Sequence, residues 1–133
     1  MRQVPVGTKG SYEFTVTGKD LAGTMEPSLP PVLATAMMSL AMEMAAMDAL
    51  KSYIEPGEMT VGAIVNVRHT AATPEGWQVR TEAEVTGMDG RRIDFTVRAF
   101  DDKEEIGRGT HSRVVLDRAK FDQRLTAKVK SKG

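Results

Sequence analysis

Apolar residues fill nearly every position of the segment from residue 32 to residue 50, instead of forming one stripe. The segment is rich in Met and Ala, which are good helix formers, and it contains no Gly or Pro. We expect a helix from about residue 32 or 35 to about residue 53, because prolines precede it and a Pro-Gly turn follows it. Glu43 and Asp48 inside the segment argue against a membrane span. A helix that is apolar all round is buried on most sides, so we expect this one to lie in the core.

Five other segments alternate apolar and polar residues with a period of two, which is typical of strands. They span about residues 11–17, 60–70, 77–85, 93–99 and 106–116. In the second of these segments the alternation puts Val61, Ala63, Val65, Val67 and His69 on one face. Residues 20–31 form a loop long enough to be a functional lid. A short helix over residues 117–125 and a basic, flexible tail over residues 126–133 are expected to end the chain.

The order of the predicted elements is one strand, one long apolar helix and then four strands joined mostly by short turns. Strands that meander in this way pair antiparallel, and a helix that is apolar all round needs a curved sheet around it. We therefore predict an α+β hotdog fold, in which a five-stranded antiparallel sheet wraps around one central helix. Such a sheet leaves an exposed edge strand, which favours a two-fold homodimer and leaves higher assemblies open.

Composition narrows the class of protein further. The chain has 133 residues, which suffice for a single domain over 1–133. Basic and acidic residues both number 18, so the net charge of zero gives no support for a nucleic acid or a membrane as partner. Cysteine is absent and the N-terminus lacks the apolar stretch of a signal peptide, so we expect a cytoplasmic protein. The two histidines show no metal-ligand spacing, and we expect neither a metal nor a cofactor.

Three polar residues stand out by their place in apolar elements: Thr35 near the start of the helix, Glu43 in its middle and His69 at the end of the apolar face of a strand. A carboxylate, a hydroxyl and an imidazole are the usual parts of a hydrolytic site. Thr35 and Glu43 lie ~12 Å apart along a regular helix at ~1.5 Å per residue. They therefore meet only if the helix start is irregular, if one acts across a dimer interface, or if each touches a different part of a ligand.

Other interpretations of these residues remain open. Glu43 can simply pair with an arginine inside a dimer, and Thr35 can serve as a helix cap. His111, between Thr110 and Ser112, is predicted to be structural rather than catalytic. A pocket lined by methionines could bind an acyl-CoA or another apolar molecule without turnover. A hotdog enoyl-CoA hydratase is a further alternative, although the Asp-His pair usual for such enzymes is not found.

Short motifs with a defined spacing occur between residues 32 and 121. They are Ala34-Thr35-Ala36-Met37-Met38, Met42-Glu43, Tyr53-Ile54-Glu55-Pro56-Gly57-Glu58, Val61-Gly62, Val67-Arg68-His69-Thr70-Ala71-Ala72-Thr73-Pro74, Asp89-Gly90-Arg91-Arg92 and Ile106-Gly107-Arg108-Gly109-Thr110-His111-Ser112-Arg113. Together these motifs resemble the fluoroacetyl-CoA thioesterase-like family of hotdog proteins.

The resemblance implies a homodimeric acyl-CoA thioesterase that hydrolyses a small or medium acyl-CoA, with coenzyme A as part of the substrate. It implies catalytic roles for Thr35, Glu43 and His69, a glycine near the thioester at Gly62, and a functional arginine at Arg113. Leu29, in the lid segment, and Met38, in the helix, are added as substrate-binding residues. Fluoroacetyl-specific members carry phenylalanines in the lid, whereas residues 25–31 here contain none, so the sequence leaves the identity of the acyl group open, fluoroacetyl included.

Overall fold

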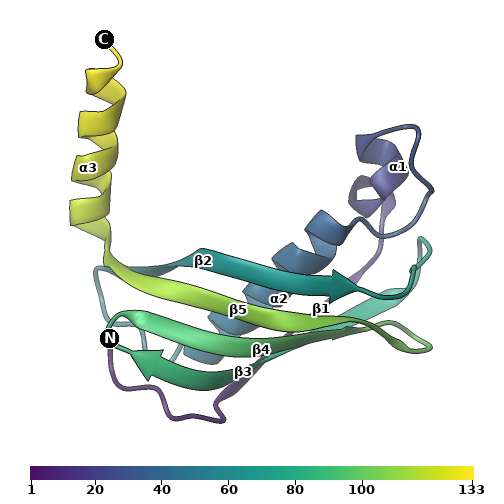
Figure 1. Cartoon of the computed structure of the whole chain (residues 1–133), viewed down its shortest axis with the longest axis horizontal. Helices are drawn as coiled ribbons and strands as arrows, with labels where there is room; N and C mark the ends of the chain where they lie inside the picture. Colours follow the sequence, from purple (N-terminus) through teal and green to yellow (C-terminus); the bar gives the residue numbers. More distant parts are fainter.

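The computed structural model describes residues 1–133 as one curved antiparallel sheet with a helix lying across it (Figure 1). The strands lie in the order β1-β3-β4-β5-β2, so β1 and β2 form the two edges. The bounds of the strands are β1 Lys9–Thr15, β2 Glu58–His69, β3 Gln78–Asp89, β4 Arg92–Phe100 and β5 Glu105–Asp117. The helices are η1 Gly18–Asp20, α1 Ala22–Met25, α2 Thr35–Leu50 and α3 Arg118–Ser131.

The central helix α2 packs on the concave face of the sheet, as its apolar sequence predicts. One side of the helix is fully covered by the sheet, with Met38, Met42 and Leu50 all buried. The helix approaches β1 so closely that a side chain at Gly10 would collide with the backbone of Ala45. This close approach needs a glycine at that strand position and leaves no room for a larger residue.

The inner face of the sheet follows the predicted alternation in the central strands. The buried residues are Val79, Thr81, Ala83 and Val85 in β3, and Ile93, Phe95, Val97 and Ala99 in β4. Thr81 is the single hydroxyl in this set, and it donates a hydrogen bond to the carbonyl of Ala41 in α2 at 2.9 Å or to that of Tyr12 at 3.0 Å. The buried polar group is therefore satisfied, and it ties the helix to the sheet.

The helix is less enclosed than its sequence predicts. Leu40 is 47% exposed, and Met44 and Met47 are also exposed on the side that faces away from the sheet. The prediction of burial on most sides is wrong for the single chain, because five strands cover only one side of a helix. An exposed apolar patch of this kind marks an interaction surface.

The edge strand β2 contains a bulge that the alternation of its sequence did not predict. The pairing with β5 shifts between Gly62 and Ile64, so Ala63 is the extra residue. Because of this shift, Gly62 faces the helix on one side of the bulge, whereas Val65, Val67 and His69 face it on the other. The expectation that Val61 and Ala63 share a face with His69 is therefore wrong.

The segment before α2 is more ordered than the expected loop. It contains the short helices η1 and α1, and it returns to α2 through backbone hydrogen bonds from Ala22 to Val32 and from Gly23 to Pro30. The fully buried carboxylate of Asp20 accepts hydrogen bonds from the backbone and hydroxyl of Thr17 and from Lys19. We call residues 18–34 the lid, because the chain leaves the sheet, folds back on itself and re-enters at the start of α2.

The C-terminal helix α3 begins after the Asp117 cap and continues to Ser131, six residues further than the sequence predicts. It projects past the β2 edge and away from the body of the molecule (Figure 1). All of its side chains are exposed except that of Phe121, which is half-buried. No helix of the protein is both long enough and apolar enough to cross a bilayer.

Candidate active site

Thr35 and His69 meet at the end of the molecule where the lid lies. Thr35 is the first residue of α2 and His69 is the last residue of β2. Their side chains are joined by a hydrogen bond of 2.8 Å between Thr35 Oγ1 and His69 Nδ1. The pairing of a hydroxyl with an imidazole is the arrangement that activates or orients a reacting group.

The other ring nitrogen of His69, Nε2, is buried and has no hydrogen-bond partner in the chain. An unpaired buried polar atom costs free energy, and its presence in a native fold calls for an explanation such as a bound substrate. Burial also lowers the pKa of His69 below its ordinary value of 6.5. The imidazole is therefore neutral at neutral pH and able to accept a proton.

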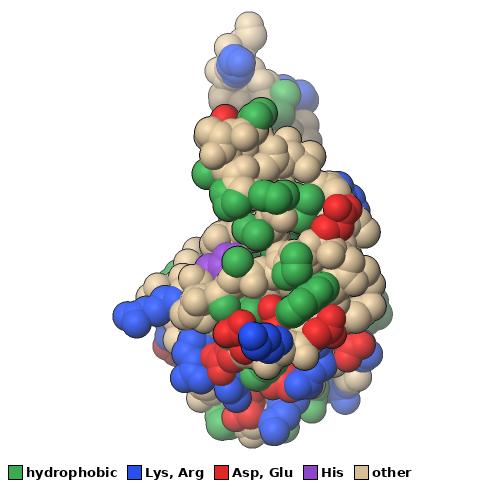
Figure 2. Space-filling model, turned by 90° about the vertical axis from the view of Figure 1, so that its right-hand side faces the viewer, with side chains coloured by type: hydrophobic (Ala, Val, Ile, Leu, Met, Phe, Trp, Pro, Cys, Tyr) green, Lys and Arg blue, Asp and Glu red, His purple; other side chains and the backbone are tan.

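An apolar groove of about 400 Å³ opens beside this pair. Apart from Thr35, His69 and Thr70, its walls are alanine or aliphatic residues, namely Ala22, Leu29, Val32, Leu33, Ala71 and Ala72. Figure 2 shows this end of the molecule, with hydrophobic side chains gathered in its middle, the surface of a histidine beside them and charged side chains below. No Asp, Glu, Lys or Arg lines the groove, and the imidazole of His69 is neutral, so the groove suits an aliphatic group.

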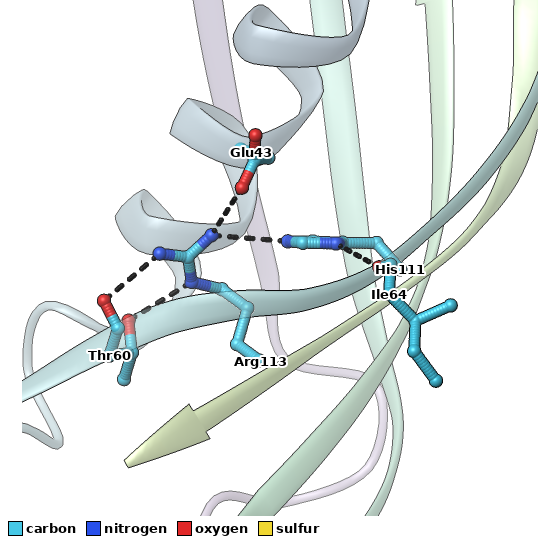
Figure 3. Close-up of polar contacts among 5 residues, drawn as sticks. All are labelled: Glu43, Thr60, Ile64, His111 and Arg113. Atoms are coloured by element: carbon cyan, nitrogen blue, oxygen red, sulfur yellow. Dashed lines mark hydrogen bonds and ion pairs between the residues drawn. The ribbon is translucent and has the colours of Figure 1, made fainter. Parts of the chain in front are cut away.

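Glu43 projects from α2 into a second polar cluster, which it forms with residues of β2 and β5 (Figure 3). The buried guanidinium of Arg113 donates to Glu43 Oε1 at 3.1 Å, and to the hydroxyl and carbonyl of Thr60 at 3.0 Å each. The same guanidinium lies 3.2 Å from His111 Nε2. Glu43 Oε2 has no hydrogen-bond partner, and the Glu43 side chain is 29% exposed, so one carboxylate oxygen is anchored and the other is free.

Gly62 completes this second cluster. A side chain at Gly62 would collide with Glu43 Oε1 and would come within 3.4 Å of the His111 ring. The absence of a side chain therefore leaves the carboxylate against the bare backbone of β2.

The structure brings the predicted site residues together in two groups rather than one. Thr35, His69 and Leu29 share the groove, whereas Glu43, Gly62 and Arg113 form the second cluster. No hydrogen bond joins His69 to Glu43 within a single chain, whereas an ion pair of Glu43 with an arginine is present. Met38 is fully buried in the core and does not line the groove, so we assign it to the core instead of the substrate-binding residues.

Sequence reasoning missed Thr60 and gave His111 no place in the site. The signal lay in β5, where the alternation puts His111 and Arg113 on the same inner face as the buried Val115. A charged residue on a buried strand face must have partners, and those partners can be sought on the facing helix.

Comparison with known proteins places this geometry in a family. The model of the fluoroacetyl-CoA-specific thioesterase family matches residues 16–119. A fluoroacetyl-CoA thioesterase from Streptantibioticus cattleyicolor is 38% identical over 129 residues, which cover 92% of this chain and 93% of that protein. The chain belongs to the fluoroacetyl-CoA-specific thioesterase family.

Solved structures agree with the family assignment. The fluoroacetyl-CoA thioesterase FlK superposes with a TM-score of 0.89 and 36% identity, covering 96% of this chain and 98% of that one. A thioesterase superfamily member from Thermus thermophilus gives a TM-score of 0.90 at 30% identity, covering 98% and 99% of the two chains. The predicted family, the hotdog fold and the class of acyl-CoA thioesterase are thereby confirmed.

Proposed function

We propose that the protein hydrolyses short- to medium-chain aliphatic acyl-CoA thioesters at a site that two copies of the chain build together. The observation that carries this proposal is the Thr35–His69 pair, whose unpaired Nε2 lies beside an apolar groove. Hydrolysis produces the free acid and coenzyme A and needs no other cofactor.

Each residue has a chemical part in this proposal. Glu43, with one oxygen held by Arg113, uses its free oxygen to activate water or to attack the thioester carbonyl. Thr35 positions the thioester or the nucleophile. His69, which is neutral, polarises the carbonyl or passes to the departing thiolate the proton that the attacking water releases. The backbone N–H of Gly62 is a candidate donor to the oxyanion, a contact commonly worth about 3 kcal/mol in the transition state.

Within one chain, the Thr35–His69 pair and the cluster around Glu43 are too far apart to act on the same thioester bond. Gly62, beside Glu43, and His69 are seven residues apart on β2, which is roughly 20 Å at about 3.3 Å per residue. A second chain resolves this separation. If β2 pairs antiparallel with its copy about an axis near Val65 and Asn66, Gly62 of one chain lies opposite His69 of the other, and Glu43 approaches the Thr35–His69 pair.

The surface of the single chain supports this dimer. One side of β2 is unpaired along its whole length, and Ile64 and Val65 on this edge are 56% and 43% exposed. Leu40 and Met47 on α2 add exposed apolar surface that a second copy would cover. Pairing the edge strand with its copy satisfies its backbone groups and removes an aggregation-prone edge.

The activity is tested by following free thiol release from a panel of acyl-CoAs that runs from acetyl and fluoroacetyl to octanoyl. We expect the highest kcat/KM for a linear aliphatic group longer than acetyl. Glu43→Ala and His69→Ala should lose this activity, and variants as fast as the parent would refute the catalytic assignment. Including an enoyl-CoA separates hydrolysis from hydration, because a hydratase consumes it without releasing thiol.

The shared site is tested by subunit complementation. We expect co-expressed Glu43→Ala and Thr35→Ala chains to recover about a quarter of parent activity, because half of randomly formed dimers are mixed and each mixed dimer has one intact site. The matched control combines Thr35→Ala with His69→Ala, which come from the same chain in the proposed site and should recover nothing. Recovery in neither mixture would mean that each chain carries its own complete site.

A further inference from the structure

His111 is a deeply buried ionisable side chain in the same cluster as Glu43, and the reaction as described does not use it. It is 1% exposed and stacks against Phe95, with ring centroids 5.9 Å apart. Both of its ring nitrogens are engaged, Nδ1 with the carbonyl of Ile64 at 2.7 Å and Nε2 with Arg113 at 3.2 Å. A buried histidine that is fully paired on two sides fixes both of the groups that it touches.

The two partners of His111 determine its protonation state. A carbonyl oxygen can only accept a hydrogen bond, so Nδ1 carries the proton. A guanidinium can only donate, so Nε2 presents its lone pair to Arg113. His111 is therefore the neutral tautomer with the hydrogen on Nδ1, and a second proton would point directly at a cation.

Each partner of His111 belongs to the site. Ile64 adjoins the bulge that turns Gly62 toward the helix, and Arg113 holds the anchored oxygen of Glu43. The imidazole of His111 thus links the backbone of β2 beside the Glu43 carboxylate to the Arg113 guanidinium that binds this carboxylate (Figure 3). The charged groups facing His111 are Glu43 from α2 and Arg113 from β5, whereas β2 and β4 present only uncharged groups to it, the Ile64 carbonyl and the Phe95 ring.

We infer that neutral His111 is a positioning residue for thioester hydrolysis. It holds Arg113 and the Gly62–Ile64 bulge in place relative to each other, and it thereby sets the direction of the Glu43 carboxylate. It does not touch the substrate, because its ring is enclosed by the sheet and the helix. The inference rests on the proposed function of Glu43. Protonation of His111 in acid would break its contact with Arg113 and release the carboxylate.

Three substitutions separate the two contacts. His111→Phe keeps the stacking on Phe95 and loses both hydrogen bonds, His111→Asn places an amide where Nδ1 stands, and His111→Gln places an acceptor closer to Arg113. We expect His111→Phe to lower kcat about 10- to 100-fold, since a displacement of about 1 Å can cost roughly 10²-fold. KM should change by less than about threefold, and the Asn and Gln variants should each recover part of kcat.

The control for a merely structural role is Val97→Ala, which opens a cavity in the same core without touching the cluster. It should lower the melting temperature but leave kcat near that of the parent. A folded His111→Phe variant with the kcat of the parent would overturn the inference, and so would a loss of kcat that Val97→Ala reproduces.

Two readouts without turnover keep this inference separate from the proposed function. Ring-nitrogen NMR of the parent should give the Nδ1–H tautomer of His111 at neutral pH, and a protonated ring there would overturn the inference. A crystal structure of His111→Phe should show the Glu43 carboxylate displaced from Arg113, and an unmoved carboxylate would overturn it as well. A parent that hydrolyses no acyl-CoA refutes the proposed function, whereas these two readouts still decide whether His111 holds the cluster.

Discussion

Thr35 is the residue whose contribution can be isolated most cleanly. It is exposed and bonded only to His69, so replacing it disturbs neither the core nor the ion pair of Glu43. We expect Thr35→Val, which keeps the shape and removes the hydroxyl, to lower kcat by about 10²-fold or more. Thr35→Ser should retain most of the activity. Steady-state thiol release measures both, and equal activity of the Val and Ser variants would contradict a role for the hydroxyl.

The pH dependence of the reaction should reveal the environment of His69. Because burial disfavours the charged imidazolium, the pKa of His69 lies below 6.5 and the ring stays neutral at that pH. We expect kcat/KM to be level from neutral pH down past 6.5 and to fall as the pH drops through the lowered pKa. A profile whose acid midpoint lies at or above 6.5 would show that the imidazole is solvated.

Among the elements, the bulge in β2 has the sharpest consequence for the site. A methyl group at Gly62 would collide with Glu43 Oε1, which is the far end of a flexible side chain. Gly62→Ala should therefore leave the melting temperature nearly unchanged while kcat falls by about 10- to 100-fold through a misplaced carboxylate. Gly87→Ala is the matched control, because a methyl group there meets nothing within 4 Å. Equal kcat in the two variants would remove Gly62 from the site.

The lid depends on a single buried carboxylate. Burial alone would raise the pKa of Asp20, but the hydrogen bonds from Lys19 and Thr17 outweigh burial and leave the pKa below 3.8. The ionised form thus stabilises the folded state above pH 3.8, and this contribution is lost as the pH falls through the lowered pKa.

We expect Asp20→Asn to cost about 1–3 kcal/mol at pH 7, because buried donors lose a charged acceptor. The difference in unfolding free energy between parent and variant should shrink in acid. Denaturant titrations at several pH values measure it, and a difference that does not change with pH would exclude the carboxylate charge as the cause.

The elements that the sequence predicts correctly are those whose pattern is local. The alternation of β3 and β4 and the nearly continuous apolar run of α2 follow directly from side-chain type. The bulge at Ala63 was not predictable, because an extra residue in one strand is fixed by pairing with β5. The contacts of Arg113 with Thr60 and His111 were not predictable for the same reason, since they depend on the pairing of β2 with β5.

At the scale of the whole molecule, activity is expected to depend on assembly. Ile64→Lys would place a charged side chain from each copy within the proposed β2–β2 pairing, and Ile64 is exposed in the single chain. We expect a folded monomer with little thioesterase activity. Sedimentation and thiol release measure the two properties, and an active monomer would contradict the shared site.

The projecting helix α3 separates the charges of the molecule. From Arg118 onward the chain holds six basic residues and one acidic residue, a net charge of +5, so the remaining residues carry −5 within a chain of zero net charge. The protein is consequently an electric dipole. Residues 1–117 repel the phosphates of coenzyme A, and the positively charged helix α3 attracts them. Lys128→Glu with Lys130→Glu should lower kcat/KM at low ionic strength, and the effect should vanish at high salt. Although the net charge is zero, the separated charges produce an electrostatic field that can guide an anionic substrate toward the enzyme.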